Sequence, residues 1–172
     1  PDKLSDGKSI VFEDRPTGKA IVFDHETKVA LVGNKMNSFY LLPGGGIDNG
    51  ESIENGITRE CLEEIGCRVN IQNEVGVIED FRNRDKKHCI NYCYTAELIG
   101  EKGAPTLMED EKNNGMHVIW VPLSEALAIL EKEVGQLKKG EVTFYNTGFN
   151  ILRDNLFLKE AQKQMVKKVG VI

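Results

Sequence analysis

Three glutamates in one segment of the sequence are spaced so that they could bind a metal ion together. Glu60, Glu63 and Glu64 lie at positions i, i+3 and i+4 of a stretch expected to be helical, so they fall within roughly 100° of one helix face. Carboxylates this close repel one another, and each close pair costs on the order of a few tenths of a kcal/mol. A hard divalent cation would offset the repulsion, because Mg²⁺ and Mn²⁺ prefer oxygen ligands.

The residues around these glutamates fit such a site. Gly56 lies one turn before Glu60, and a glycine inside a helix costs about 1 kcal/mol relative to alanine. One reason to keep it is that a glycine leaves space for a loop or a ligand. Arg59 can pair with Glu63, four residues later, or with Glu51 from the preceding loop. Such pairing would hold the carboxylates in place.

A run of three glycines, Gly44 to Gly46, precedes this helix and follows a short apolar segment. Glycines allow a tight turn and let the backbone N–H and C=O groups come close to a ligand. A backbone carbonyl of this loop could therefore be a further oxygen ligand of the metal ion.

The apolar pattern predicts the elements that position these residues. Strands are expected at 20–23, 29–32, 40–42, 75–81, 89–98 and 117–121. Helices are expected at 52–65 with Gly66 as C-cap, after Ser124 as N-cap, and at about 144–169. The segment 100–115 is expected to be a polar loop. Because strands and helices are mixed, the class is α/β or α+β, with helices covering a sheet.

The segment from Gly45 to Cys67, GGIDNGESIENGITRECLEEIGC, covers 23 of the 172 residues. It resembles the Nudix box, G-x5-E-x7-R-E-U-x-E-E-x-G-U, in which U is an apolar residue. Every fixed charged and glycine position agrees, and Cys61 and Cys67 occupy the two U positions. The resemblance implies an α/β fold of the Nudix type, an α/β/α sandwich with a mixed β-sheet. Residues 1–172 are expected to form a single Nudix hydrolase domain.

The resemblance also implies an activity. Nudix enzymes hydrolyse a pyrophosphate bond in a nucleoside diphosphate linked to a group X, with Mg²⁺ or Mn²⁺ bound by the box. The metal ligands implied here are Glu60, Glu63, Glu64 and the backbone carbonyl of Gly45. Arg59 and Glu51 would orient the glutamates. The partner is therefore expected to be a small-molecule nucleotide substrate.

The general base is not placed uniformly within this family. The candidates here are Glu60, Glu63, Glu109 and Glu111, and a glutamate of the box is favoured. Several Nudix proteins take an extra metal ligand from the region of the acidic segment 109–111, and Glu111 is the preferred candidate. The alternative is that this segment is a solvated loop.

Residues outside the box determine the group X. Arg82 and Arg84 belong to a basic connection that could bind phosphates, or that could simply be an exposed hairpin loop. Lys35 is another possible phosphate contact. Phe39 or Tyr40 could stack on a base, but strand alternation places one of these two in the core. Sequence markers of the ADP-ribose, diadenosine polyphosphate and NADH subclasses are absent, so the sequence does not identify X.

Composition excludes several classes of protein. The net charge of −5 disfavours binding to duplex nucleic acid, and no apolar stretch of about 18 residues predicts a membrane span. No signal-peptide pattern is present at residues 1–12.

The four cysteines form no C-x-x-C pair and are expected to be small core residues in a reducing cytoplasm. A homodimer is common in this family, and the sequence does not decide the oligomeric state.

Two other functions are open at this level. A Nudix-fold module could sense a nucleotide or regulate without useful turnover, although the intact glutamates favour an enzyme. A related prenyl diphosphate isomerase would need a catalytic cysteine in a loop pocket, and no cysteine here has that position. An enzyme that removes the cap of messenger RNA would need a basic surface to bind RNA. The acidic net charge of this chain argues against such a surface.

Overall fold

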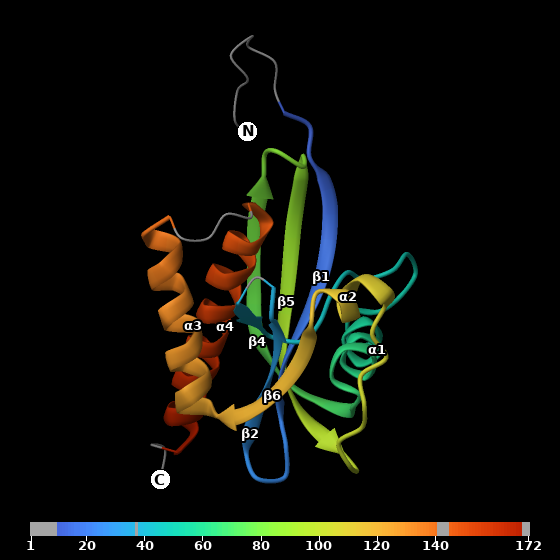
Figure 1. The fold of residues 1–172 in the computed structure, drawn as a ribbon, viewed down its shortest axis with the longest axis vertical. Helices are drawn as coiled ribbons and strands as arrows, with labels where there is room; N and C mark the ends of the chain where they lie inside the picture. The colour runs from blue at the N-terminus through green and yellow to red at the C-terminus, as the bar shows by residue number, and fades with distance from the viewer. Residues whose placement is uncertain (1–9, 37, 141–144, 170–172) are drawn as a thin grey trace.

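A six-stranded mixed sheet between two layers of helices makes up the described part of the chain, residues 10–36, 38–140 and 145–169 of a computed structural model (Figure 1). Helix α1 covers one face of the sheet, and α3 and α4 cover the other (Figure 1). The elements in chain order are β1 (Glu13–Phe23), β2 (Lys28–Asn34), β3 (Phe39–Leu41), α1 (Ile53–Ile65), β4 (Arg68–Arg82), β5 (Lys87–Ile99), α2 (Glu109–Asn113), β6 (Met116–Pro122), α3 (Leu123–Lys138) and α4 (Tyr145–Val169).

The sheet has the order β3-β2-β1-β5-β4, and β6 pairs with β2. Strands β1 and β5 are parallel, whereas the other pairs are antiparallel, so the sheet is mixed. The predicted α/β/α sandwich with a mixed sheet is confirmed. None of the helices in the described part of the chain is both long and apolar enough to cross a membrane.

Side chains of the central strands alternate between the two faces of the sheet, so a hydrophobic core lies on each face. Ala20 and Val22 of β1 face α1, while Ile21 between them faces α3 and α4. Both cores are closed to solvent, and the residues named here are fully buried. The four cysteines are buried free thiols, as the sequence predicts.

The helix of the box forms where the sequence predicts it. Ser52 is the N-cap of α1, and its side chain accepts a hydrogen bond from the backbone N–H of Asn55 at 3.2 Å. Gly66 ends the helix in the left-handed conformation, with φ of 66°. The apolar face that carries Ile57 and Cys61 packs against the sheet, so the glutamates lie at the edge of a core.

Four predictions about the elements are wrong in detail. Strand β1 begins at Glu13 and not at residue 20, because its first residues are mostly polar and interrupt the apolar pattern. Strand β4 begins at Arg68 and not at residue 75, because register shifts between Ile71 and Gly76 interrupt its alternation. Helix α3 begins at Leu123 with Pro122 at the N-cap, so Ser124 lies inside the first turn and caps nothing. The expected loop 100–115 contains the short helix α2.

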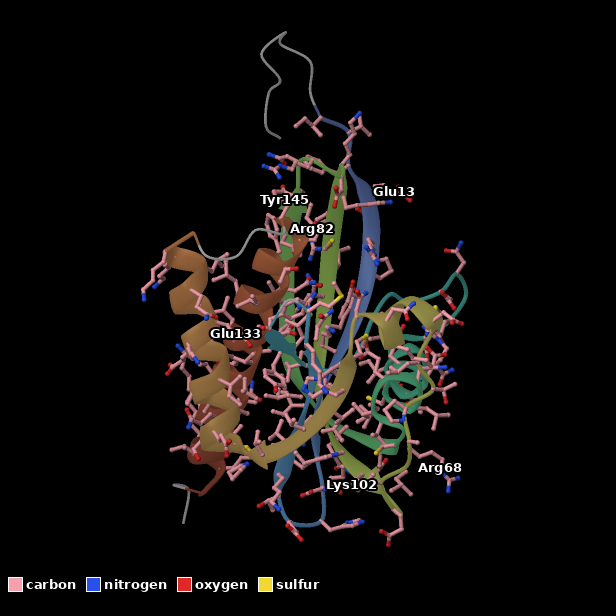
Figure 2. The ribbon with its side chains drawn as sticks, in the orientation of Figure 1. Glu13, Arg68, Arg82, Lys102, Glu133 and Tyr145 are labelled. Carbon is pink, nitrogen blue, oxygen red and sulfur yellow. The ribbon has the colours of Figure 1, made fainter. Side chains whose placement is uncertain are left out.

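The outer edge of β3 is held by carboxylates from the helices. The backbone N–H of Tyr40 donates to Glu133 of α3 at 2.6 Å, and that of Leu42 donates to Asp154 of α4 at 2.9 Å. Figure 2 shows Glu133 between α3 and the sheet. Because the glycine-rich loop follows β3 directly, the two helices fix the position where that loop begins.

Glu133 gives the fold an expected dependence on pH. Its carboxyl is buried, and burial raises its pKa from 4.5 to about 7. The unfolded chain loses this proton near pH 4.5, so stability should fall as the pH rises from 4.5 to about 7 and then level off. We expect Glu133→Gln to weaken this slope, measured as the free energy of unfolding between pH 4.5 and 8. An unchanged slope would show that another group controls it.

Candidate active site

Arg59 is the centre of the glutamate cluster. Its guanidinium donates to both carboxylate oxygens of Glu51 at 3.1 Å, to Glu60 at 2.8 Å and to Glu63 at 3.4 Å. It also donates to the backbone carbonyl of Gly46 at 3.0 Å. These contacts raise the pKa of Arg59, and its hydrogen bonds lower the pKa of Glu51. Both predicted pairings of Arg59 are therefore present, and Arg59 additionally binds Glu60 and the loop.

The glycine-rich loop packs closely against the carboxylates. A Cβ atom on Gly45 would lie 2.6 Å from the carboxylate of Glu60. The backbone N–H of Gly44 donates to Glu64 at 2.7 Å, and the carbonyl of Gly45 accepts the N–H of Gly18 at 2.9 Å. The loop thus brings backbone oxygens and carboxylates together at one place.

The expectation that Gly56 leaves space for a loop is confirmed. A Cβ atom on Gly56 would overlap the side chain of Ile47 and approach Glu51 to 3.0 Å. The space beside the helix is filled by the loop of the box itself, which lets Glu51 reach Arg59.

The donor set fits a hard divalent cation, although the side chains do not yet converge. Carboxylate oxygens of Glu60, Glu63 and Glu64 and the carbonyl of Gly45 are the ligand types that Mg²⁺ and Mn²⁺ prefer. In the described part of the chain, no three carboxylate, imidazole or thiol groups are gathered as ligands of one metal ion. Glu60 and Glu63 turn to Arg59, and Glu64 turns to Gly44. Joint ligation therefore requires side-chain rotation, for which Glu63 at 45% exposure has room.

A buried lysine under the glycine-rich loop holds the loop in place. Lys19 donates from Nζ to the carbonyl of Leu42 at 2.9 Å and to the carbonyl of Gly44. Burial lowers the pKa of Lys19, whereas the nearby carboxylates of Asp154 and Glu64 oppose that shift. Sequence analysis missed this residue, because the strand was predicted to begin only at residue 20.

Two cavities adjoin the loop. The first, here called the cationic cavity, has a volume of about 240 Å³. Its charged lining residues are Arg15, Lys19, Arg82, Arg153 and Glu64, and the three loop glycines also line it.

The second cavity, here called the apolar cavity, has a volume of about 200 Å³. Its apolar side chains are Val32, Phe39, Leu41, Leu42 and Met116. The two cavities share Lys19, Leu41 and Glu64, so they meet at the edge of the glutamate cluster.

The predicted substrate-binding residues separate into two groups. Arg82 lines the cationic cavity and Phe39 lines the apolar cavity, whereas Tyr40 packs against the core, as the alternation rule requires. Arg84 and Lys35 line neither cavity. The Arg84 guanidinium lies 4.6 Å from the ring centre of Tyr145, on an exposed hairpin.

The acidic segment 109–111 lies in α2, a short helix that precedes β6. Glu109 is exposed and lines neither cavity. The side chain of Glu111 lies outside the described part of the structure, so its proposed role as an extra ligand stays a prediction.

Five polar residues of the cationic cavity escaped sequence analysis, namely Arg15, Thr17, Lys19, Asn150 and Arg153. A signal was present for three of them. Arg15, Thr17 and Lys19 alternate along β1, which places their side chains on the face that α4 covers. Asn150 and Arg153 come from α4, and no local pattern links them to the box.

Comparison with known proteins identifies the family of the chain. A model of the NUDIX domain matches residues 14–142, which leaves α4 outside the match. An ADP-ribose pyrophosphatase of Methanocaldococcus jannaschii is 28% identical over 82 residues, which are 46% of this chain and 48% of that protein. Diphosphoinositol polyphosphate phosphohydrolase 2 of Rattus norvegicus is 28% identical over 110 residues, which are 63% of this chain and 57% of that protein.

The fold has relatives of known structure. A NUDIX hydrolase from Nitrosomonas europaea superposes with a TM-score of 0.56 at 19% identity, over 68% of this chain and 78% of that chain. The chain spans about half the length of the two curated relatives. With the box, the mixed sheet and the domain match all in agreement, the chain belongs to the NUDIX domain family.

Proposed function

We propose that this protein hydrolyses a pyrophosphate bond in a nucleoside diphosphate linked to a group X, with Mg²⁺ or Mn²⁺ as cofactor. The observation that carries the proposal is the position of Arg59. It binds Glu51, Glu60 and Glu63 together and ties them to Gly46 of the glycine-rich loop. An arginine that orients several carboxylates beside a glycine-rich loop supports a working cation site. Membership of the Nudix family supports the same reaction.

The residues take complementary roles in this proposal. Glu60, Glu63 and Glu64, with the carbonyl of Gly45, would hold the cation. When bound, a divalent cation neutralises the charge of a pyrophosphate and lowers the pKa of a water molecule. Arg59 and Glu51 keep the carboxylates oriented, and Lys19 fixes the backbone of the loop.

A glutamate of the box is proposed to accept the proton of the attacking water. Glu63 is the best placed, because its side chain is 45% exposed. Its contact with Arg59, at 3.4 Å, is also the longest of the hydrogen bonds that Arg59 donates. A base that is reachable and weakly held can move to the water at little cost.

The proposal is tested by product release from a panel of substrates, with Mg²⁺ and with a chelator. The panel holds nucleoside triphosphates, oxidised nucleotides, ADP-ribose, dinucleoside polyphosphates, nucleotide sugars and NADH. The Glu64→Gln variant is the blank. Metal-dependent cleavage that is lost in the variant is expected. Tight binding of one member without cleavage of any would support a sensing module and would overturn the enzyme.

Mg²⁺ should raise the thermal stability of the folded chain. Since the site exists only in the folded state, tenfold excess over the dissociation constant contributes about 1.4 kcal/mol, or roughly 3–6 °C in Tm. Thermal unfolding with and without Mg²⁺ measures this shift, and Glu63→Gln should reduce it. A shift of equal size in the variant would place Mg²⁺ elsewhere.

The proposed compartment is the cytoplasm. The four cysteines are free and buried, a pattern typical of proteins kept in a reducing environment. The proposed partner remains a small nucleotide.

A further inference from the structure

The cationic cavity presents guanidinium groups to which an anion could bind. Four cations, Arg15, Lys19, Arg82 and Arg153, line it with the single carboxylate of Glu64. We propose that the group X of the substrate carries its own negative charge, such as a phosphate, and that X binds in this cavity. This inference rests on the proposed function, because it assigns the substrate class of the same site.

Two buried arginines form a preorganised wall of the cavity. Arg82 donates from Nη2 to Oδ1 of Asn150 at 2.9 Å, and Arg153 donates from Nη1 to the same oxygen at 3.1 Å. Both arginines are about 95% buried. The shared amide oxygen holds the two guanidinium groups close together, so an anion placed between them and the loop could accept hydrogen bonds from both.

Carboxylates hold these arginines without covering them completely. Arg82 is paired with Asp80 at 2.8 Å, and Arg153 is paired with Asp154 at 2.7 Å. Within the described residues, Nη1 of Arg82 and Nη2 of Arg153 have no hydrogen-bond partner. Each arginine therefore retains donors for an anionic oxygen.

Arg15 supplies an adaptable charge at the mouth of the cavity. Its side chain is exposed, and it forms no ion pair or hydrogen bond with another side chain in the described part of the chain. Its Nη2 atom lies 4.0 Å from the position that a Cβ on Gly46 would take. Arg15 therefore stands beside the loop of the proposed reaction centre with an uncommitted guanidinium.

The apolar cavity gives the rest of the substrate a separate place. It is lined by Phe39 and Met116, and it meets the cationic cavity at Lys19 and Glu64. A nucleotide with its base on the apolar side would direct its phosphates across Glu64. The group beyond the second phosphate would then enter the cationic cavity. The hydroxyl groups of a neutral sugar can accept hydrogen bonds from the guanidinium donors there, but these bonds are weaker than the charge-assisted bonds of a phosphate oxygen.

The wall of this cavity depends on a part of the chain that the domain match does not include. Asn150 and Arg153 lie in α4, beyond residue 142. Figure 2 shows Arg82 at the end of the molecule where α4 begins with Tyr145, and Arg68 at the opposite end of β4. The preference for an anionic group X is therefore inferred from residues outside the box, some of which lie in α4.

The experiment compares two ligands with the same nucleoside: the triphosphate, in which X is a phosphate, and the diphosphate methyl ester, in which X is neutral. We expect kcat/KM for the triphosphate to exceed that for the ester. Arg15→Gln should reduce it about 5- to 20-fold for the triphosphate, mainly through KM, and less than twofold for the ester. Arg68→Gln removes an exposed charge of the same kind at the far end of β4 and should change neither ligand.

Binding in Ca²⁺, measured by calorimetry, gives the same comparison without relying on turnover. Tighter binding of the triphosphate that Arg15→Gln abolishes supports the inference even if the chain has no hydrolytic activity. Equal or better use of the ester, or equal effects of Arg15→Gln and Arg68→Gln, would overturn the anionic assignment while leaving hydrolysis intact. Loss of all metal-dependent cleavage, with the binding preference retained, would overturn only the proposed function.

Discussion

Glu63→Gln and Glu64→Gln should each lower turnover by roughly 10²- to 10⁴-fold. Each change removes a charged oxygen that the proposed site uses to hold a divalent cation, and Glu63→Gln also removes the favoured base. The measurement is kcat with saturating Mg²⁺ on the best substrate of the panel. The amide oxygen that replaces the Glu64 carboxylate can still accept the N–H of Gly44, so the loop should keep its position.

The fold should survive both changes. Removing one of several mutually repelling carboxylates is expected to alter the free energy of unfolding by less than about 1 kcal/mol. Glu54→Gln is the matched control, because Glu54 is an exposed glutamate in the first turn of the same helix. It should leave turnover unchanged. Near-normal rates in Glu63→Gln or Glu64→Gln would show that the ligand assignment is wrong.

Arg59→Lys should reduce activity by about 10- to 100-fold, although the positive charge is retained. Lysine cannot donate in two directions to Glu51 while also reaching Glu60, Glu63 and the carbonyl of Gly46. The carboxylates would then lose their fixed orientation. We also expect a loss of about 1–3 kcal/mol in stability, because several partly buried hydrogen bonds disappear.

The two effects of Arg59→Lys can be separated. If Arg59 only stabilised the fold, the residual activity measured well below Tm would be normal. An orienting role predicts a weaker affinity for Mg²⁺ in the folded variant, measured by the Mg²⁺ concentration that gives half-maximal rate. An unchanged Mg²⁺ requirement together with normal kcat would contradict the orienting role.

Helical periodicity explains why the glutamate cluster could be predicted from the sequence. Residues at i, i+3 and i+4 share a face in any regular helix, so Glu60, Glu63 and Glu64 can be placed on one side of α1 without knowledge of the rest of the fold. The same local logic predicted the helix from Ser52 to Ile65, Gly66 as its C-cap and the division of Phe39 and Tyr40 between cavity and core. Each of these depends only on neighbours in the chain.

The cationic cavity could not be predicted in this way, because its residues meet only through long-range packing. Arg15 is brought beside Cys89 by the parallel pairing of β1 with β5, and Arg153 arrives when α4 packs across that face. Helix α4 also supplies Asp154 to the backbone of Leu42. The start of β4 could not be predicted either, because register shifts in its pairing with β5 interrupt the alternating pattern of apolar residues.

Direct binding of Mn²⁺ tests the central claim, that the glutamates of α1 hold the cation used for hydrolysis. The measurement is titration followed by electron paramagnetic resonance, with a non-hydrolysable nucleotide present. The account predicts a bound Mn²⁺ signal in the unaltered protein and in Glu54→Gln. It predicts affinity at least tenfold weaker in the double variant Glu63→Gln, Glu64→Gln. Equal Mn²⁺ affinity in the double variant and the unaltered protein would contradict it.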